Sequence, residues 1–247
     1  MQNEIPAIDT FWQQLYSASQ SQKIDEQAIT SVQLNNDLTQ FTSINSSQER
    51  WVASPAAGVV RILLERDGGE KTTRATSLVA YQANSQFSSH NHPKGEEFFV
   101  LAGTFSDENG DYPAGTYVRN PPGSSHKPFS KNGCLIFVKL QQFLDGDLEH
   151  VVSTVDLSTQ GSDILFDGSE SGNEIVSIYK ANKKKSLPDS LIKNGAEILV
   201  LSGAISKGSV CYDVGSWLRL PVGSSSTIDI HDNSALLIKI DHLRIKR

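Results

Sequence analysis

The sequence predicts an all-β protein made of two tandem β-domains, with one short helix or tail at its N-terminus. Three observations predict this fold class. Short β-rich runs recur along the chain, turn-forming residues separate most of them, and an internal repeat divides them into two similar sets. Many short strands with tight turns favour an antiparallel sandwich or barrel over a parallel sheet.

The expected elements begin with a helix near Ile8–Ala18, followed by Gln- and Ser-rich residues 17–22 that we interpret as a tether. The lysine run Lys183–Lys185 is interpreted as a solvated loop between later strands. The expected strands are, in chain order, VVRILLE, TSLVAY, EFFVLAGTF, GTYVRN, CLIFVKL, EIVSIY, EILVLSGAI, SWLRL, TIDI and ALLIKI.

The internal repeat has a constant offset of 100 residues. GEEFFVLAGTF (Gly95–Phe105) aligns with GAEILVLSGAI (Gly195–Ile205), and GTYVRNPPGSSH (Gly115–His126) aligns with GSWLRLPVGSSS (Gly215–Ser226). Several turn glycines are present in both copies, because the turns of a shared fold need them whatever the chemistry. The same offset relates the pairs Arg119/Arg219, Pro121/Pro221 and Lys139/Lys239.

The repeat predicts the domain organisation. We expect an N-terminal tail at 1–28, a first β-domain at 29–146 and a second at 147–247. A chain of 247 residues is long enough for two domains of this size.

Composition excludes several classes of function. A net charge of -6 is unlike the basic surface that non-specific nucleic-acid binding needs. The N-terminus lacks the basic start and apolar core of a signal peptide, and no apolar run is long enough to span a bilayer. The two cysteines, Cys134 and Cys211, match no metal-binding spacing and predict no disulfide framework. We therefore expect a soluble cytoplasmic protein without nucleic-acid or membrane partners.

The segment HNHPKGEEFFVLAG gathers two of the six histidines of the chain and two adjacent carboxylates. His90 and His92 are two residues apart, so on a strand their side chains face the same side. Pro93, Lys94 and Gly95 then predict a turn, after which a carboxylate can return toward the histidines. Either Glu96 or Glu97 could do so, and the facing parity favours Glu96.

These residues resemble the two-part signature of the cupin superfamily: His90-x-His92-x3-Glu96-x6-Gly103, then Gly115-x5-Pro121-x-Gly123-x2-His126. The similarity is greater to the cupin domain of ChrR, a zinc-containing anti-sigma factor. It is carried by the segments RATSLVAY, HNHPKGEEFFVLAG, DYPAGTYVRNPPGSSHKPFS and GCLIFVKL. Ser130 departs from the general signature, which often has Asn there. The resemblance implies two RmlC-like jelly-roll β-barrels, and a metal bound by His90, His92, Glu96 and His126.

Three imidazoles and one carboxylate suit Zn, Fe, Mn or Ni better than Ca or Mg, and we expect one divalent ion, Zn first. The four ligands allow either a closed tetrahedron, typical of structural or sensing sites, or an octahedron with two open positions for catalysis. His150, His231 and His242 are interpreted as structural or surface residues, and Cys134 as a buried thiol rather than a redox sensor.

The second copy lacks these ligands. At the offset of 100, the four positions are Ser190, Ile192, Ala196 and Ser226. The sequence therefore predicts a metal-free second barrel that retains the turns of the first.

The sequence is compatible with three functions. The resemblance implies a sensor of reactive oxygen species that regulates an anti-sigma domain, but about 30–45 residues precede the first barrel here and they contain no His or Cys. We therefore expect a regulatory bicupin without tight sigma-factor binding. The alternative is a metal-dependent small-molecule enzyme, such as a cupin dioxygenase or isomerase; a binding module without chemistry is a third reading. A small-molecule ligand at the metal and a homodimer are compatible with the sequence.

Overall fold

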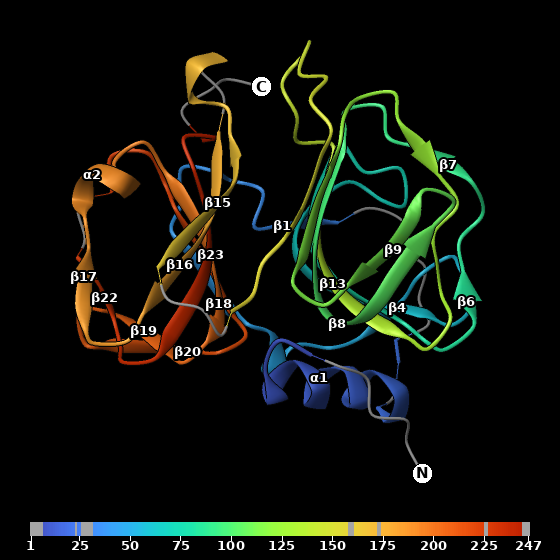
Figure 1. Ribbon diagram of the computed structural model, residues 1–247, viewed down its shortest axis with the longest axis horizontal. Coiled ribbons are helices and arrows are strands. Elements are labelled where there is room, and N and C mark those ends of the chain that lie inside the picture. Colours follow the sequence, from blue (N-terminus) through green and yellow to red (C-terminus); the bar gives the residue numbers. More distant parts are fainter. Residues whose placement is uncertain are drawn as a thin grey trace. The chain divides into compact units, whose positions relative to one another are not determined.

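A computed structural model describes residues 7–22, 24–25, 32–157, 161–171, 174–224 and 227–243. Contacts divide the chain into two units, one formed by 1–36 with 49–155 and the other by 37–48 with 156–247. Antiparallel strands form most of each unit, as the sequence predicts (Figure 1). The predicted domain boundaries remain a prediction, and the contacts place 37–48 in the second unit and 147–155 in the first. No helix in the described part of the chain is long and apolar enough to cross a membrane.

The first unit contains one helix and thirteen strands among its described residues. These are α1 (Thr10–Ser21), β1 (Gln33–Leu34), β3 (Val52–Ala53), β4 (Val59–Asp67), β5 (Arg74–Tyr81), β6 (Ser85–Gln86), β7 (His90–Asn91), β8 (Glu96–Asp107), β9 (Gly110–Pro113), β10 (Thr116–Asn120), β11 (Ser125–His126), β12 (Phe129–Ser130), β13 (Cys134–Leu140) and β14 (Val151–Thr154). The main strand order is β1-β4-β5-β13-β8-β10-β14, while β7 and β11 form a separate pair.

Helix α1 starts two residues later and ends three residues later than the sequence predicts. Asp9 accepts a hydrogen bond from the Phe11 backbone N–H, which caps the helix and fixes its start. Most of the residues interpreted as a tether, 17–21, belong to the helix. Ser19 lies on the buried face of the helix with Trp12 and Tyr16. The helix packs against β8 and β13. Just before the helix, the Ile8 N–H donates to the Leu101 carbonyl on β8 at 3.0 Å.

The interior of the first barrel is apolar and aromatic. Alternate residues of β8 and β13 contribute to it, among them Phe98, Val100 and Ile136. Glu96 has the same strand parity as Phe98, so the carboxylate of Glu96 faces this interior, whereas Glu97 faces the opposite side.

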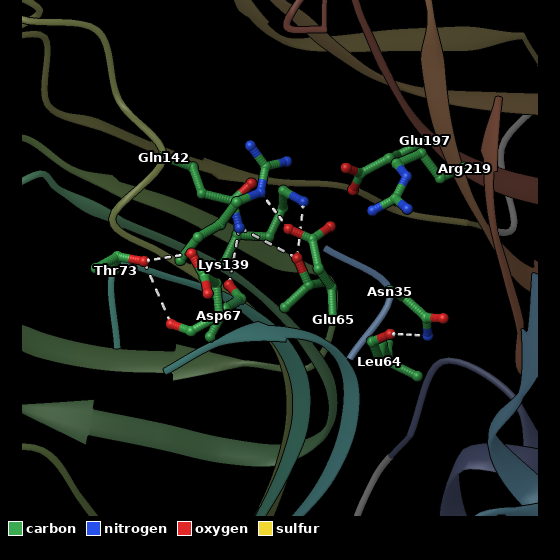
Figure 2. A network of polar contacts seen from close by, with 12 residues as sticks. Asn35, Leu64, Glu65, Asp67, Thr73, Lys139, Gln142, Glu197 and Arg219 are labelled. Carbon is green, nitrogen blue, oxygen red and sulfur yellow. Dashed lines mark hydrogen bonds and ion pairs between the residues drawn. The ribbon is translucent and has the colours of Figure 1, made fainter. Parts of the chain in front are cut away.

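The opposite face of this sheet carries a buried polar network (Figure 2). Lys139 Nζ donates to Thr76 Oγ1 at 3.0 Å, and Gln142 Nε2 donates to the same oxygen at 3.1 Å. Glu65 is fully buried and forms an ion pair with Arg74. Because each charge has a polar partner, burial of these groups is tolerated in the fold.

The second unit repeats the architecture. Its described elements are β2 (Thr42–Asn45), η1 (Ser46–Gln48), β15 (Ser162–Asp167), η2 (Ser169–Ser171), β16 (Ile175–Ala181), β17 (Lys185–Leu187), α2 (Asp189–Ile192), β18 (Ala196–Ser202), β19 (Ala204–Lys207), β20 (Val210–Asp213), β21 (Ser216–Leu220), β22 (Ile228–Ile230) and β23 (Ser234–Ile240). They form a six-stranded sheet, β15-β16-β23-β18-β21-β2, and a four-stranded sheet, β17-β22-β19-β20. The lysine run is not wholly a loop, since Lys185 begins β17 and its Nζ lies 4.2 Å from the ring centroid of Tyr179.

The strand registers of the two units agree at the offset of 100. Glu97 pairs with Arg119 across β8 and β10, and Glu197 pairs with Arg219 across β18 and β21. Lys139 and Lys239 stand opposite Glu97 and Glu197, respectively. The sequence repeat is therefore a repeat of backbone pairing.

Candidate metal centre

The four residues of the expected ligand set come together in the first unit. His90 on β7 is the strand partner of His126 on β11, Glu96 begins β8, and His92 follows β7 directly. One ligand atom from each of the four lies within 4.8 Å of all the others. The imidazole centroids of His90, His92 and His126 are 4.7 to 5.1 Å apart. Within the described residues these four side chains form a cluster able to hold a metal ion.

A tight turn brings Glu96 back toward the histidines. The Gly95 N–H donates to the His92 carbonyl at 3.2 Å, and Gly95 has a φ of +77°, a conformation that glycine adopts without strain. A side chain at this position would also collide, because a Cβ atom would lie 2.4 Å from the Phe143 ring. The sequence between His92 and Glu96 therefore dictates the approach of the carboxylate.

A second turn positions His126. The Ser124 N–H donates to the Pro121 carbonyl at 3.1 Å, and the His92 N–H donates to the Ser124 carbonyl at 2.9 Å. These bonds tie the segment before β11 to the segment after β7. The pairing of β7 and β11 then places His126 beside His90.

The Nδ1 atom of each histidine lies within hydrogen-bond distance of a group outside the cluster. His90 Nδ1 lies 3.0 Å from the Ser88 carbonyl, His92 Nδ1 lies 3.1 Å from Ser124 Oγ, and His126 Nδ1 lies 3.1 Å from Asp107 Oδ2. A carbonyl and a carboxylate only accept hydrogen bonds, so they hold the proton of His90 and His126 on Nδ1. The lone pair of Nε2 is then available to a metal.

Two of these Nε2 atoms are buried without a hydrogen-bond partner, those of His92 and His126. They lie 3.6 and 3.5 Å from the two carboxylate oxygens of Glu96. Buried polar atoms are normally satisfied, and exceptions that converge on one point indicate an ion. The residues present therefore fit a divalent cation with nitrogen and oxygen ligands.

The electrostatic environment shifts the pKa values of the two buried histidines, His92 and His126, in opposite directions. Burial lowers the pKa of His92, although the Glu96 charge partly opposes this, so His92 is a neutral imidazole at pH 7. Burial also disfavours protonation of His126, but the hydrogen bond to Asp107 and the charges of Glu96 and Asp107 raise its pKa above the ordinary value. Of these two candidate ligands, His126 is the one for which a proton would compete with a metal.

Glu97 points away from the cluster, as strand parity predicts. Its carboxylate accepts a hydrogen bond of 2.6 Å from the Tyr117 hydroxyl on the opposite face of the sheet. Glu97 is nevertheless a buried residue, only 3% exposed. Its role is in the buried polar layer of that face.

The second barrel replaces the cluster with aliphatic packing. Ile192 and Ala196, at the positions of His92 and Glu96, are fully buried in an aliphatic core, while Ser190 is exposed. Ser226 lies outside the described residues. No cluster of three or more His, Cys, Asp or Glu able to hold a metal occurs in the described part of this unit.

Sequence reasoning missed two buried residues next to the cluster. Asp107 contacts His126, and Asn120 Nδ2 donates to Glu96 Oε1 at 3.3 Å. The repeat carries a signal for both, since the equivalent residues at the offset of 100 are Lys207 and Leu220. These two positions change together with the ligands, while the turn glycines do not.

The remaining histidines and Cys134 are structural or surface residues. His150 is exposed, and His231 Nε2 lies 3.2 Å from Ser206 Oγ. His242 is buried and its Nε2 lies 3.0 Å from Glu197 Oε1. Burial raises the pKa of the Cys134 thiol to about 12, so this cysteine is not a reactive thiolate.

Comparison with known proteins identifies the fold. Residues 39–144 match the family model described as ChrR Cupin-like domain. No curated protein matches the sequence.

Several solved structures share the architecture. Bacterial pirin YhhW from Escherichia coli, solved in complex with nickel(II), has a TM-score of 0.63 and 12% identity, with 81% of this chain and 98% of that chain covered. Protein Ylba from E. coli has a TM-score of 0.63 and 13% identity, covering 85% and 92%. A cupin 2 conserved barrel domain protein from Leptotrichia buccalis has a TM-score of 0.54 and 12% identity, covering 84% and 99%. At these identities the likeness concerns the fold alone.

Proposed function

We propose that the first unit binds one divalent transition-metal ion, and the match of residues 39–144 to the family model of the ChrR Cupin-like domain supports this proposal. The ligands are His90, His92, Glu96 and His126. The observation that carries the proposal is the convergence of two buried, unpartnered Nε2 atoms on the Glu96 carboxylate. A cation would satisfy all three groups and neutralise the buried charge of Glu96.

The donor set selects among metals. Three imidazoles and a carboxylate suit Zn, Fe, Mn or Ni, and we propose Zn as the first candidate. Nickel is among these candidates because of the donor set; the bacterial pirin solved with nickel(II) shares the fold alone. When bound, the ion supplies a Lewis acid that small molecules can approach.

The function we propose for this centre is sensing and regulation in the manner of ChrR-type cupins, in the cytoplasm and without tight sigma-factor binding. The partly exposed His90 supports a site that a small molecule can reach. In this role the four side chains would hold the ion, and the ion would supply a coordination site that responds to a signal molecule.

A metal-dependent enzyme acting on a small molecule is the second candidate. The same exposure of His90 favours it, because catalysis needs an open coordination position, whereas a structural ion is closed off by protein ligands. Turnover of an organic substrate that depends on the added metal would support the enzyme. Metal-dependent binding of a protein partner, without turnover, would support the regulator.

Elemental analysis of the purified full chain tests metal binding. We expect about one ion per chain in the wild type, and a loss of most of it in His92→Ala. His231→Ala is the matched control, because His231 lies in the second unit and contacts Ser206. Two tightly bound ions per chain, or none after metal-replete purification, would overturn the proposal.

A further inference from the structure

We propose that Asp107 is a positioning residue that fixes the tautomer and orientation of His126 and thereby sets the metal affinity of the centre. This inference rests on the proposed metal binding. It assigns a role to a carboxylate that the sequence motif does not include.

Asp107 is the last residue of β8 and is only 8% exposed. Its Oδ2 lies 3.1 Å from His126 Nδ1. Its Oδ1 accepts hydrogen bonds from the Asn109 N–H at 2.8 Å and from the Tyr112 hydroxyl at 3.2 Å. One oxygen therefore anchors the carboxylate to the β8–β9 hairpin, and the other is left to hold the imidazole.

The partner of each histidine determines how firmly its ring is set. Ser124 Oγ, beside His92, can donate or accept a hydrogen bond, so it permits either tautomer. The Asp107 carboxylate can only accept, so the proton of neutral His126 stays on Nδ1 and the lone pair stays on Nε2. A negatively charged partner also makes the imidazole a stronger metal donor, an effect that the neutral partners of His90 and His92 do not supply.

The internal repeat separates this role from a role in the hairpin fold. The β19–β20 hairpin of the second unit has the same register as β8–β9 and keeps Tyr212 at the position of Tyr112. It has Lys207 at the position of Asp107. The hairpin of the second unit therefore forms without a carboxylate at this position. The carboxylate, Asp107, occurs in the unit that contains His126.

The test is the metal affinity of Asp107→Asn, measured by Co²⁺ and Zn²⁺ titration of the full chain. The Asn oxygen can still accept from Asn109 and Tyr112, so we expect the fold to persist. The Asn amide would donate to His126 Nδ1, which moves the ring proton to Nε2 and opposes metal binding. We expect affinity to fall about 10–100-fold, with a changed Co²⁺ absorption spectrum.

Asp111→Asn is the matched control. It is the same chemical change in the same hairpin, but Asp111 is exposed and accepts a hydrogen bond from Ser106 Oγ at 2.6 Å. This variant should keep the wild-type affinity and Co²⁺ spectrum.

A second measurement needs no variant. In ¹⁵N NMR spectra of the metal-free wild type, recorded at a pH where His126 is neutral, the His126 ring should be the Nδ1–H tautomer. An Nε2–H tautomer, or equal affinities for Asp107→Asn and the wild type, would overturn the inference while leaving metal binding intact. A wild type that binds no metal would instead overturn the proposed function.

Discussion

Asn120 Nδ2 donates a hydrogen bond of 3.3 Å to Glu96 Oε1, from a position directly opposite Glu96 in the pairing of β10 with β8. Both side chains are buried, so this hydrogen bond helps to fix the orientation of the Glu96 carboxylate. The equivalent pair in the second unit, Leu220 and Ala196, is apolar. Asn120 therefore belongs to the supporting layer of the centre.

Asn120→Leu should weaken metal binding about 10-fold, because Glu96 loses the donor that orients it. Leucine is tolerated at the equivalent place in the second unit, so we expect the protein to fold. Zn²⁺ affinity from competition with a chelator is the measurement. An unchanged affinity would show that the turn at Gly95 is sufficient to orient Glu96.

The two adjacent glutamates should respond differently to the same substitution. Glu96→Gln removes the charge that offsets the cation, so metal content after dialysis against a weak chelator should fall strongly. Glu97→Gln should retain the metal. It should still lower the free energy of unfolding by about 1–3 kcal/mol, because the Gln amide is a weaker, uncharged acceptor for Tyr117 and places an NH₂ donor where a buried carboxylate oxygen stood. Metal loss in Glu97→Gln alone would mean that the register of β8 has been misassigned.

Metal affinity should increase as the pH rises through the pKa of His126. Burial opposes the protonation of this residue, but Asp107 and Glu96 raise its pKa above the ordinary value of about 6.5, so a proton competes with the ion at neutral pH. The stability of the metal-free protein should change in the opposite direction, falling as the pH rises. The raised pKa of His126 contributes stability that is fully present below about pH 6.5, and this contribution is lost as the pH rises through the pKa of His126 in the folded protein.

Isothermal titration calorimetry of Zn²⁺ binding in buffers of different ionisation enthalpy checks this prediction by counting released protons. We expect proton release below the pKa of His126 and much less above it. Asp107→Asn should move this transition to lower pH. Affinity that does not vary with pH across this range would contradict the assignment of His126 as a ligand.

Gly95→Ala should destabilise the first unit and deplete the metal. Both the positive φ and a Cβ atom 2.4 Å from the Phe143 ring oppose any side chain there. Gly146→Ala is the control, since Gly146 has a φ of +84° with no atom close enough to clash. The control should cost about 1–2 kcal/mol from backbone strain alone. Chemical denaturation of the two variants should show a larger loss in Gly95→Ala.

Strand positions, and the four side chains that cluster in the first unit, could be predicted from the sequence because they depend on local patterns. Parity along β8 selected Glu96 over Glu97, and the structure places their side chains on opposite faces. The repeat anticipated the aliphatic residues Ile192 and Ala196 in the second barrel.

Other features depend on contacts between distant residues, and they were not predicted. The burial of Glu97 requires Tyr117 from another strand. The role of Asp107 requires β8 to end beside β11, which no spacing along the chain reveals. The helix end was misplaced because serine and glutamine favour a tether by composition, whereas Ser19 is buried and donates to the Tyr16 carbonyl.

The chain supplies β2 to the second unit from a segment that precedes most of the first. Asn45 on β2 donates a hydrogen bond to Ser216 on β21, 171 residues later in the sequence. During synthesis, β2 leaves the ribosome early and must wait for β21 before it can pair, while the first barrel can already close around its own strands. Final assembly of the second unit is therefore a late step of biogenesis, in which an early-made strand completes a late-made sheet.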